Sequence, residues 1–255
     1  MIIEVCVDSL ESAVTAIKAG ADQVELVSLT EVGGVTPSIG LLEAVLERGI
    51  TTMAMVRPRA AGFCYSDFDK EVMLRDVEAF RRAGAQGVVF GALNADGTVD
   101  FEFSKRFCEK AGDMDVVFHR AFEVVKDKMS AAKKLSEIGV RRILTKGGNS
   151  LVDGQDIIRE LLTLGKPEII SGGVRENTIE LIKDLGLKFV HVSSGREVVD
   201  TSTAGTGIYF GKNGDKSDEV YTVADADYLR KIINNLRSIL QSACKLQLFD
   251  CSECK

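Results

Sequence analysis

The residues best suited to chemistry are the chain's two histidines, His119 and His191. His119 ends the apolar run VVF at 116–118 and is followed by Arg120, and His191 lies within the run FVHVS at 189–193. An imidazole at the end of an apolar strand costs desolvation free energy unless it has polar partners. Because both histidines are placed in this way, the sequence predicts one shared site to which several strands contribute.

The elements that would carry these residues repeat along the chain. Gly20, Gly84, Gly139 and Gly186 each fit the left-handed residue that closes a helix, and each precedes a short apolar strand. Alternating helices and buried strands are typical of βα units. Eight strands are expected, near 2–7, 23–28, 52–57, 87–91, 115–119, 141–145, 167–171 and 188–193.

Eight such units in 255 residues predict a single-domain (β/α)8 barrel, the TIM-barrel fold, with an open doubly wound sheet as the alternative. The barrel is expected over 1–243. A flexible tail over 244–255 would carry Cys244, Cys251 and Cys254, and its lone CxxC motif favours a reduced terminus over a metal site. The longest irregular stretch, 194–222, follows the last strand, and such long loops are usually functional or disordered.

Capping residues place the helices between the strands. Ser9 caps the first helix, Thr36 with Pro37 at the first helical position begins the second, and Asp100 caps the fourth. The seventh helix is expected from Arg175 to Leu185, and the last from Ala224 to Leu240.

Polar residues interrupt the strand patterns in one phase. Parallel strands covered on both faces should be nearly continuous apolar runs, so the interruptions predict side chains that point into the barrel. Buried charges persist only when they are paired and hydrogen-bonded, and barrel active sites lie at the C-terminal ends of the strands. The residues expected inside are Glu4, Cys6, Glu25, Arg57, His119, Thr145, His191 and Ser193.

A purely structural interpretation of this set is a polar core in which Glu4 and Glu25 clamp Arg57. Glu4 lies early in its strand, so the structural interpretation is favoured for it. His119, Arg57 and Arg120 favour a functional site, and His191 is balanced between the two interpretations.

A second group of candidates follows the seventh and eighth strands, where barrels commonly bind phosphate. Glycines there expose backbone N–H groups, and a helix that begins near Arg175 would add its positive end. Tight turns are the alternative explanation. Thr145-Lys146 after the sixth strand could add a cation. The candidate anion-binding residues are Thr145, Gly172, Gly173, Ser193, Ser194 and Gly195.

Several motifs, in order and at the right spacing over about residues 2–240, resemble the CutC family of copper-homeostasis proteins. They include EVCVDS at 4–9, GGVTPS at 33–38, MVRPR at 55–59 and FHRAF at 118–122. This resemblance implies a cytoplasmic (β/α)8 barrel, often a homodimer, with reported copper binding.

The resemblance also implies copper ligands, namely cysteines near the ends of the first two strands. Cys6 is the first of these, but Val27 and Val192 stand where the family often has cysteine. A thiolate pair would suit Cu(I), whereas a single Cys6 with distant histidines makes a poor soft site.

Composition excludes several other functions. The formal net charge is −6 and basic residues are interspersed, so nucleic acid and anionic membranes are not expected partners. No apolar run approaches the ~20 residues of a membrane helix, and no signal peptide is evident. The six cysteines form no secreted disulfide framework. A cytoplasmic location is therefore expected.

Three functions remain open. The first is copper handling. The second is an isomerase or lyase that acts on a small phosphorylated or carboxylated metabolite, with His119 as acid or base, Arg57 and Arg120 gripping the anion, and Glu25 orienting an arginine. The third is a barrel that binds a ligand without chemistry. Lys146 is not expected to serve as a Schiff-base lysine, because its phase relative to Thr145 turns it away from the interior.

Overall fold

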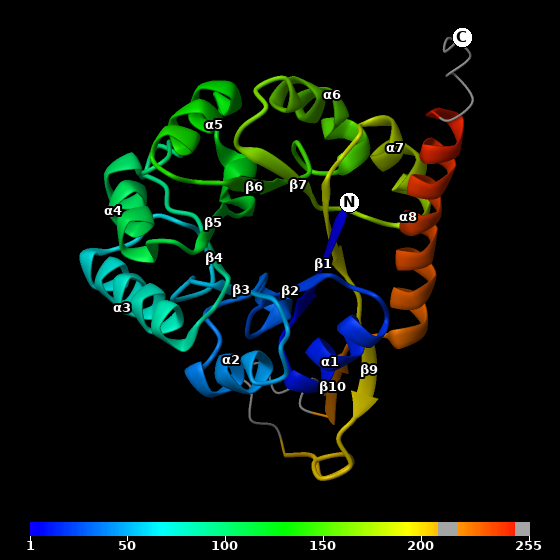
Figure 1. The fold of residues 1–255 in the computed structure, drawn as a ribbon. Helices are drawn as coiled ribbons and strands as arrows, with labels where there is room; N and C mark the ends of the chain where they lie inside the picture. The colour runs from blue at the N-terminus through cyan, green and yellow to red at the C-terminus, as the bar shows by residue number, and fades with distance from the viewer. Residues whose placement is uncertain (209–218, 248–255) are drawn as a thin grey trace.

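The computed structural model describes residues 1–208 and 219–247, with side chains up to residue 238. Within these, eight parallel strands form a closed barrel in the order β1 to β8, ringed by helices (Figure 1). The predicted (β/α)8 fold is therefore confirmed. The strands are β1 Ile2–Val7, β2 Gln23–Leu26, β3 Thr52–Met55, β4 Gly87–Phe90, β5 Asp115–Phe118, β6 Arg142–Thr145, β7 Glu168–Ser171 and β8 Phe189–Ser193.

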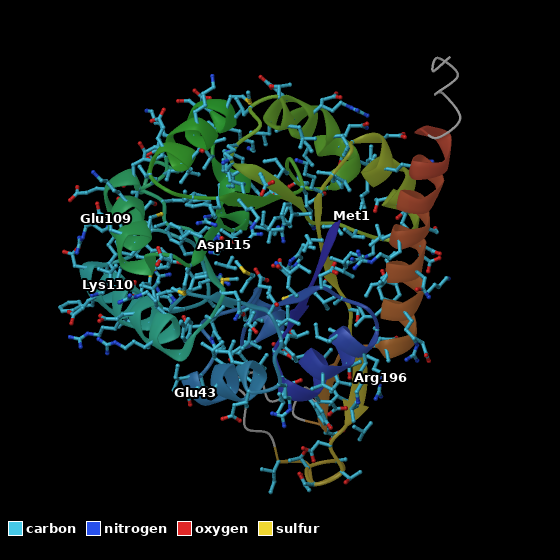
Figure 2. All side chains as sticks on the ribbon, viewed as in Figure 1. Met1, Glu43, Glu109, Lys110, Asp115 and Arg196 are labelled. Carbon is cyan, nitrogen blue, oxygen red and sulfur yellow. The ribbon has the colours of Figure 1, made fainter. Side chains whose placement is uncertain are left out.

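The helices lie outside the barrel and cover it. Their charged residues face solvent, as Glu109 and Lys110 do on α4 (Figure 2). Among the described residues, no helix combines the length and apolar character needed to cross a membrane. The helices are α1 Leu10–Lys18, α2 Ile39–Leu46, α3 Asp67–Ala83, α4 Phe101–Ala111, α5 Lys128–Glu137, α6 Leu151–Leu162, α7 Ile179–Asp184 and α8 Ala226–Gln247.

Capping residues begin several helices where the sequence predicts. Ser9 accepts a hydrogen bond from Ser12 N, and Asp100 accepts one from Phe103 N. The start predicted for α2 is wrong. Ser38, not Thr36, is its N-cap and accepts from Leu41 N, so Pro37 precedes the helix. The Ser38 side chain can accept a hydrogen bond from the first turn of α2, so the helix begins after Ser38 and not at Pro37.

The last elements also differ from expectation. A short 3-10 turn, Glu176–Thr178, precedes α7, so no regular helix starts at Arg175. The stretch expected to be irregular contains an antiparallel strand pair, β9 Arg196–Val199 with β10 Val220–Val223. Helix α8 continues to Gln247, so the boundary expected after residue 243 falls within it. The side chain of Cys244, and Cys251 and Cys254 altogether, lie outside the described residues.

Two apolar layers hold the barrel. The outer layer lies between strands and helices and includes Val5, Leu26 and Phe90. The inner layer fills the barrel interior with Met53, Val89, Val117, Leu144, Ile170 and their neighbours. Burial of such side chains contributes roughly 25 cal/mol per Å² of apolar surface. The inner layer stops short of the C-terminal strand ends, and that end holds the site.

Candidate functional site

A cavity of about 670 Å³ opens at the C-terminal end of the barrel. Its walls come from the ends of seven of the eight barrel strands or the loops that follow them, and from the β9–β10 pair. This is the face on which barrel enzymes place their active sites. Charged groups line much of it: Asp8, Glu25, Arg57, Arg120, Glu123, Lys146 and Arg175, together with His119 and His191.

The strand register explains which side chains meet at this end. Around a barrel of this kind, residues at equal height advance by about one position per strand, so inward side chains form levels from alternate strands. The level that forms the cavity floor consists of Cys6, Met55, His119 and Gly172. The level above the floor consists of Val27, Gly91, Lys146 and Ser193. The level below the floor consists of Glu25, Val89, Leu144 and His191. Glycines at two of these positions leave room above the floor.

His119 lies in the floor with only 4% of its surface exposed. Its Nδ1 accepts a hydrogen bond from Ala121 N at 3.1 Å, while its buried Nε2 has no partner among the described residues. Its ring packs against Phe63, with 4.9 Å between ring centroids. Gly91 permits this placement, because a Cβ there would lie 2.5 Å from two atoms of the imidazole.

These contacts fix the protonation state of His119. Burial, followed by the neighbouring Arg57, lowers the pKa of His119 to about 3. An acceptor at Nδ1 and a neutral ring together require a proton at Nε2. His119 therefore presents a neutral N–H donor to the cavity. The lowered pKa disfavours the acid or base role expected for His119, because burial outweighs the backbone hydrogen bond that would favour the charged ring.

His191 joins two acidic side chains across the interior. Its Nδ1 lies 2.9 Å from Glu4 Oε1, and its Nε2 lies 3.8 Å from Glu25 Oε2. Glu4 also accepts from Gln23 Nε2 at 2.6 Å. Ligand atoms of Cys6, Glu25 and His191 all lie within 4.8 Å of one another. The expectation that the histidines are distant from Cys6 is therefore wrong for His191.

Mutual electrostatics set the charges in this cluster. Burial pulls the pKa of His191 down, but Glu25 and then Glu4 outweigh it, so the pKa lies above its usual value. Burial raises the pKa of Glu25. Burial and the Glu25 carboxylate raise the pKa of the Cys6 thiol well above its ordinary range. Without a bound cation, Cys6 is therefore a protonated thiol.

Arg57 makes backbone contacts that the sequence did not indicate. Its Nη1 donates to the carbonyl oxygens of Val32 and Gly34 at 2.8 and 2.7 Å, and its Nη2 donates to Ala61 O at 2.8 Å. The predicted pairing with Glu25 is wrong, because Glu25 faces His191 instead. Since its Nη1 hydrogens are both engaged by carbonyls, Arg57 fastens two loops over the barrel end and adds positive charge to the cavity floor.

Three further cations that line the cavity, Arg120, Lys146 and Arg175, lie on the side of β5 to β7. Arg120 is exposed and 3.9 Å from Glu123 Oε1, and Arg175 is exposed on the loop after β7. Lys146 is half-buried, and burial followed by Arg120 and Arg175 lowers its pKa. Glu123 anchors this side by accepting from Thr145 Oγ1 at 2.9 Å and from Lys146 N at 2.6 Å.

The predicted phase at the end of β6 is wrong. Leu144 belongs to the inner layer and Lys146 lines the cavity, whereas Thr145 is fully buried and does not. The alternation carries no signal here, because both Ile143 and Leu144 are apolar. Thr145 instead positions the loop, through Glu123 and by accepting from Gly147 N.

The two loops predicted to bind an anion do border the cavity. Gly172 and Gly173 line it beside the Lys146 stem, and Ser193, Ser194 and Gly195 line it at the end of the neighbouring strand β8. The Ser194 hydroxyl accepts from Asp225 N at 3.1 Å. The helical stretch expected near Arg175 begins at Glu176 as a 3-10 turn, and the regular α7 follows it from Ile179.

Sequence reasoning missed some residues that line the cavity or shape it. Glu123 directly follows the FHRAF motif. It lies in the 3-10 turn Arg120–Val124, which directs its side chain back toward β6. Phe63 and Gly91 both contact His119, and the sequence gives no direct sign of these contacts. A conspicuous glycine directly after a strand is the signal that could have identified Gly91.

Comparison with known proteins gives the family. The family model described as "CutC family" matches residues 1–196. The chain belongs to the CutC family. A CutC family protein of Treponema denticola is 39% identical over 241 residues, covering 92% of this chain and 98% of the relative. A CutC family protein of Klebsiella pneumoniae is 41% identical over 199 residues, covering 76% of this chain and 81% of its own.

A solved CutC structure shares the fold as well. The protein from Streptococcus agalactiae, whose name assigns it to copper homeostasis, superposes with a TM-score of 0.70 at 27% identity. The match covers 75% of this chain and 97% of that CutC. The resemblance predicted from the motifs is thus confirmed, and the cavity described above lies in a CutC barrel.

Proposed function

We propose that this CutC protein binds a small phosphorylated or carboxylated metabolite at the barrel end and acts on it by isomerase- or lyase-type chemistry. The observation that carries the proposal is the buried N–H of His119, which has no partner among the described residues and lines a cavity rimmed by cations. An unsatisfied buried donor costs about 1–3 kcal/mol. A ligand oxygen that accepts from it would recover that cost.

The groups around the cavity divide the work of binding. Arg120, Lys146 and Arg175 would hold the anionic group by charge-assisted hydrogen bonds. His119 would donate to a neutral oxygen, as the neutral imidazole of triosephosphate isomerase does when it polarises a carbonyl group. The Glu25–His191 pair on the opposite wall would accept or return a proton.

The test is binding of a panel of phosphorylated and carboxylated metabolites, measured by thermal shift and calorimetry at physiological salt. We expect at least one compound to bind, and Arg120→Gln to weaken it about tenfold through loss of a charge-assisted contact. Arg75→Gln is the matched control, because Arg75 is exposed on α3 and far from the cavity. Equal affinity in all three proteins, or no binding by any compound, would contradict the proposal.

A second candidate function is metal binding in line with the family's association with copper. It is supported by the Cys6–Glu25–His191 cluster. Glu4 holds Nδ1 of His191, as carboxylates commonly orient metal-binding histidines, and so leaves Nε2 toward the cluster. One sulfur, one nitrogen and one oxygen, with a further carboxylate behind them, fit a borderline divalent ion such as Cu²⁺ or Zn²⁺ better than Cu⁺, which prefers several soft ligands.

Competition titrations against a chelator test this second function. Cys6→Ser should weaken Cu²⁺ binding by more than tenfold, while Cys64→Ser, which alters an exposed cysteine, should leave it unchanged. Every protein compared also carries Cys244→Ser, Cys251→Ser and Cys254→Ser, so that the C-terminal cysteines cannot contribute to copper binding. Undiminished tight binding in the Cys6→Ser protein would exclude the cluster as the site.

A further inference from the structure

Lys146 follows β6 directly, and its side chain enters the cavity. Its stem lies over the loop after β7, where a Cβ added to Gly172 or Gly173 would come within 3.4 Å of stem carbons. The floor of the cavity below it contains His119 and Gly172. The lysine stem therefore packs close to these two glycines, and all three residues line the cavity.

The Lys146 ammonium is unusually short of anions. In the described part of the chain it makes no hydrogen bond and no ion pair within 4 Å. The nearby Glu123 carboxylate is already engaged by Thr145 Oγ1 and by the backbone N–H of Lys146 itself. Arg120 and Arg175 face the same space and, after burial, disfavour the charged amine. A desolvated lysine beside other cations is the usual form of a nucleophilic amine.

We propose that Lys146 forms a Schiff base with the aldehyde or ketone group of an anionic metabolite. The proposal rests on the proposed function, and it narrows the substrate class to phosphorylated or carboxylated carbonyl compounds. Arg120 and Arg175 hold the anion beside the amine. The neutral N–H of His119 donates to the carbonyl oxygen and polarises the carbon that the amine attacks.

The step balances without any further reactant. The ammonium first gives up a proton, and the Nζ lone pair forms a bond to the carbonyl carbon while the C=O π electrons move to oxygen. That oxygen takes up two protons in total and leaves as water when the C=N bond forms. The product is a protonated imine that keeps the positive charge of the original ammonium. Both protons on the water come, through relays, from the ammonium.

Reductive trapping provides the test. The full-length protein is incubated with glyoxylate or with dihydroxyacetone phosphate and sodium cyanoborohydride, and the adducts are located by peptide mass spectrometry. We expect modification of Lys146 to exceed that of any other lysine by about tenfold or more, in line with its greater neutral fraction. Its trapping rate should also reach half its maximum at a lower pH than the rates of surface lysines.

Two variants complete the experiment. Lys146→Arg keeps a positive charge but has no nucleophilic amine, so it should bind the same anions and form no adduct in this peptide. Lys183→Arg alters a lysine paired with Glu180 on α7 and should trap as the parent protein does. The other lysines of the unmodified protein serve as internal controls that do not depend on any variant folding.

The outcomes separate the two proposals. Binding of either probe with adducts spread evenly over surface lysines, or with none at Lys146, would show that Lys146 is only an electrostatic contact, and the proposed anion site would stand. If neither probe binds and neither forms an adduct at Lys146, the Schiff base is overturned and the result also counts against the proposed function. Selective trapping at Lys146 that is lost in Lys146→Arg supports both.

Discussion

At the scale of single residues, one backbone hydrogen bond determines what His119 can do. The Ala121 N–H occupies Nδ1, so the proton must sit on Nε2, and the packed surroundings exclude a second proton. The other imidazole, that of His191, lies between the carboxylates of Glu25 and Glu4, which raise its pKa. The same side chain is therefore a donor on one wall of the cavity and a proton-sharing group on the other.

This difference predicts how the stability of His119→Ala depends on pH. In the native protein His119 stays neutral down to about pH 3, whereas the unfolded residue titrates near 6.5. The unfolded state therefore binds more protons between these values, and the stability that the neutral histidine contributes above pH 6.5 is lost as the pH falls toward 3. The variant should lack this loss, which amounts to about 1.4 kcal/mol per pH unit.

Denaturant melts at pH 7.5 and 5.0 measure the effect. At pH 7.5 the variant should be only about 1–2 kcal/mol less stable than the parent, because it loses one hydrogen bond and some packing. At pH 5.0 that difference should shrink by roughly 2 kcal/mol or change sign. A difference that does not vary with pH would show that His119 titrates normally in the folded protein.

Gly91 is predicted to be intolerant of even one methyl group. A Cβ there would lie 2.5 Å from Cε1 and Nδ1 of His119 and 2.9 Å from Ala121 Cβ. Gly91→Ala should therefore displace the imidazole and destabilise the fold by about 1–3 kcal/mol. The shift in the His119 ring signals by NMR and a urea melt would reveal it. Gly40→Ala, in α2 with nothing within 4 Å, should instead stabilise the protein by about 0.5–1 kcal/mol.

The sequence predicted which residues meet in the interior wherever polar and apolar side chains alternate. Glu25 between two apolar residues is such a case. The phase prediction failed at β6, where Ile143 and Leu144 give no contrast, and Lys146 was therefore expected to turn away from the interior. Pairing also escaped prediction. Arg57 and Glu25 have opposite charges and were expected to pair. Arg57 instead donates to three backbone carbonyl groups, and no sequence pattern predicts these contacts.

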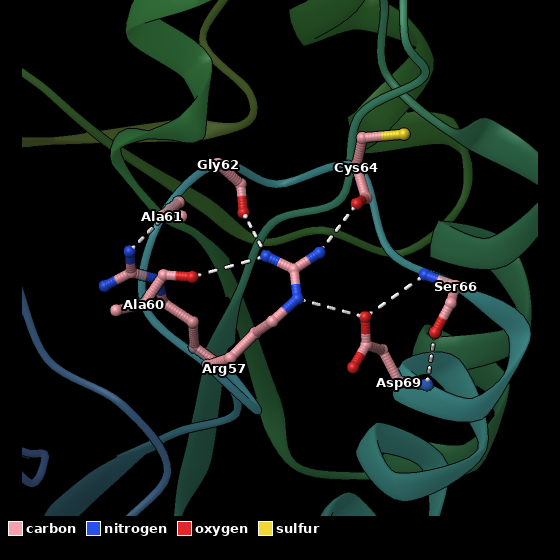
Figure 3. A network of polar contacts seen from close by, with 8 residues as sticks. Arg57, Ala60, Ala61, Gly62, Cys64, Ser66 and Asp69 are labelled. Atoms are coloured by element: carbon pink, nitrogen blue, oxygen red, sulfur yellow. Dashed lines mark hydrogen bonds and ion pairs between the residues drawn. The ribbon is translucent and has the colours of Figure 1, made fainter.

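At the scale of elements, the loop from β3 to α3 is held from two sides by arginines (Figure 3). Arg57 binds Ala61 O, while Arg59 binds the carbonyl oxygens of Ala60, Gly62 and Cys64 and pairs with Asp69 at the start of α3. Asp69 in turn completes a capping box with Ser66. This network fixes the loop that carries Phe63, and thereby the aromatic wall beside His119.

The network predicts a large effect for a nominally conservative change. In Arg57→Lys a single ammonium cannot reach all three carbonyl acceptors, so buried oxygens lose their donors and stability should fall by about 2–4 kcal/mol. Hydrogen–deuterium exchange should rise at 29–34 and 58–63 together. Arg75→Lys, which alters an exposed pair on α3, should change stability by less than about 0.5 kcal/mol. Faster exchange in only one of the two loops would mean that Arg57 does not join them.

Element positions were largely predictable, because glycine closures, capping residues and apolar runs recur along the chain. Ser9 and Asp100 both cap where the sequence indicates. The errors lie at helix starts with two competing signals, as at Thr36-Pro37-Ser38, and in the pairing of β9 with β10. That pairing joins residues 21 to 27 positions apart, from Val199 with Val220 to Arg196 with Val223, and nothing local in 196–199 indicates a partner strand.

At the scale of the whole molecule, β1 and β8 close the barrel along one seam. Glu4 sits in this seam, where its carboxylate meets Gln23 from β2 and His191 from β8. On the outside, Arg237 of α8 donates to Met1 O and pairs with Asp22 before β2. The seam is therefore held inside the barrel by the contacts of Glu4 and outside the barrel by the contacts of Arg237.

Glu4 is accordingly predicted to act in closure more than in chemistry. Glu4→Ala should cost about 3–5 kcal/mol, because it strands the buried His191 and Gln23 donors. Glu4→Gln, which keeps the shape and one acceptor, should cost clearly less. Glu43→Ala, on the exposed face of α2 (Figure 2), should change stability by at most about 0.5 kcal/mol. If Glu4→Ala melts like Glu43→Ala, the seam does not depend on this carboxylate.

The seam also has a consequence for biosynthesis. Strand β1 leaves the ribosome first, yet one of its two neighbours, β8, begins only at Phe189. At roughly 5–20 residues per second, the apolar edge of β1 remains unpaired for about 10–40 s. Nascent chains that stall before β8 would expose that edge and tend to associate through it. Chaperone binding should therefore be greatest for ribosome-bound chains that lack β8 and should fall once β8 has emerged.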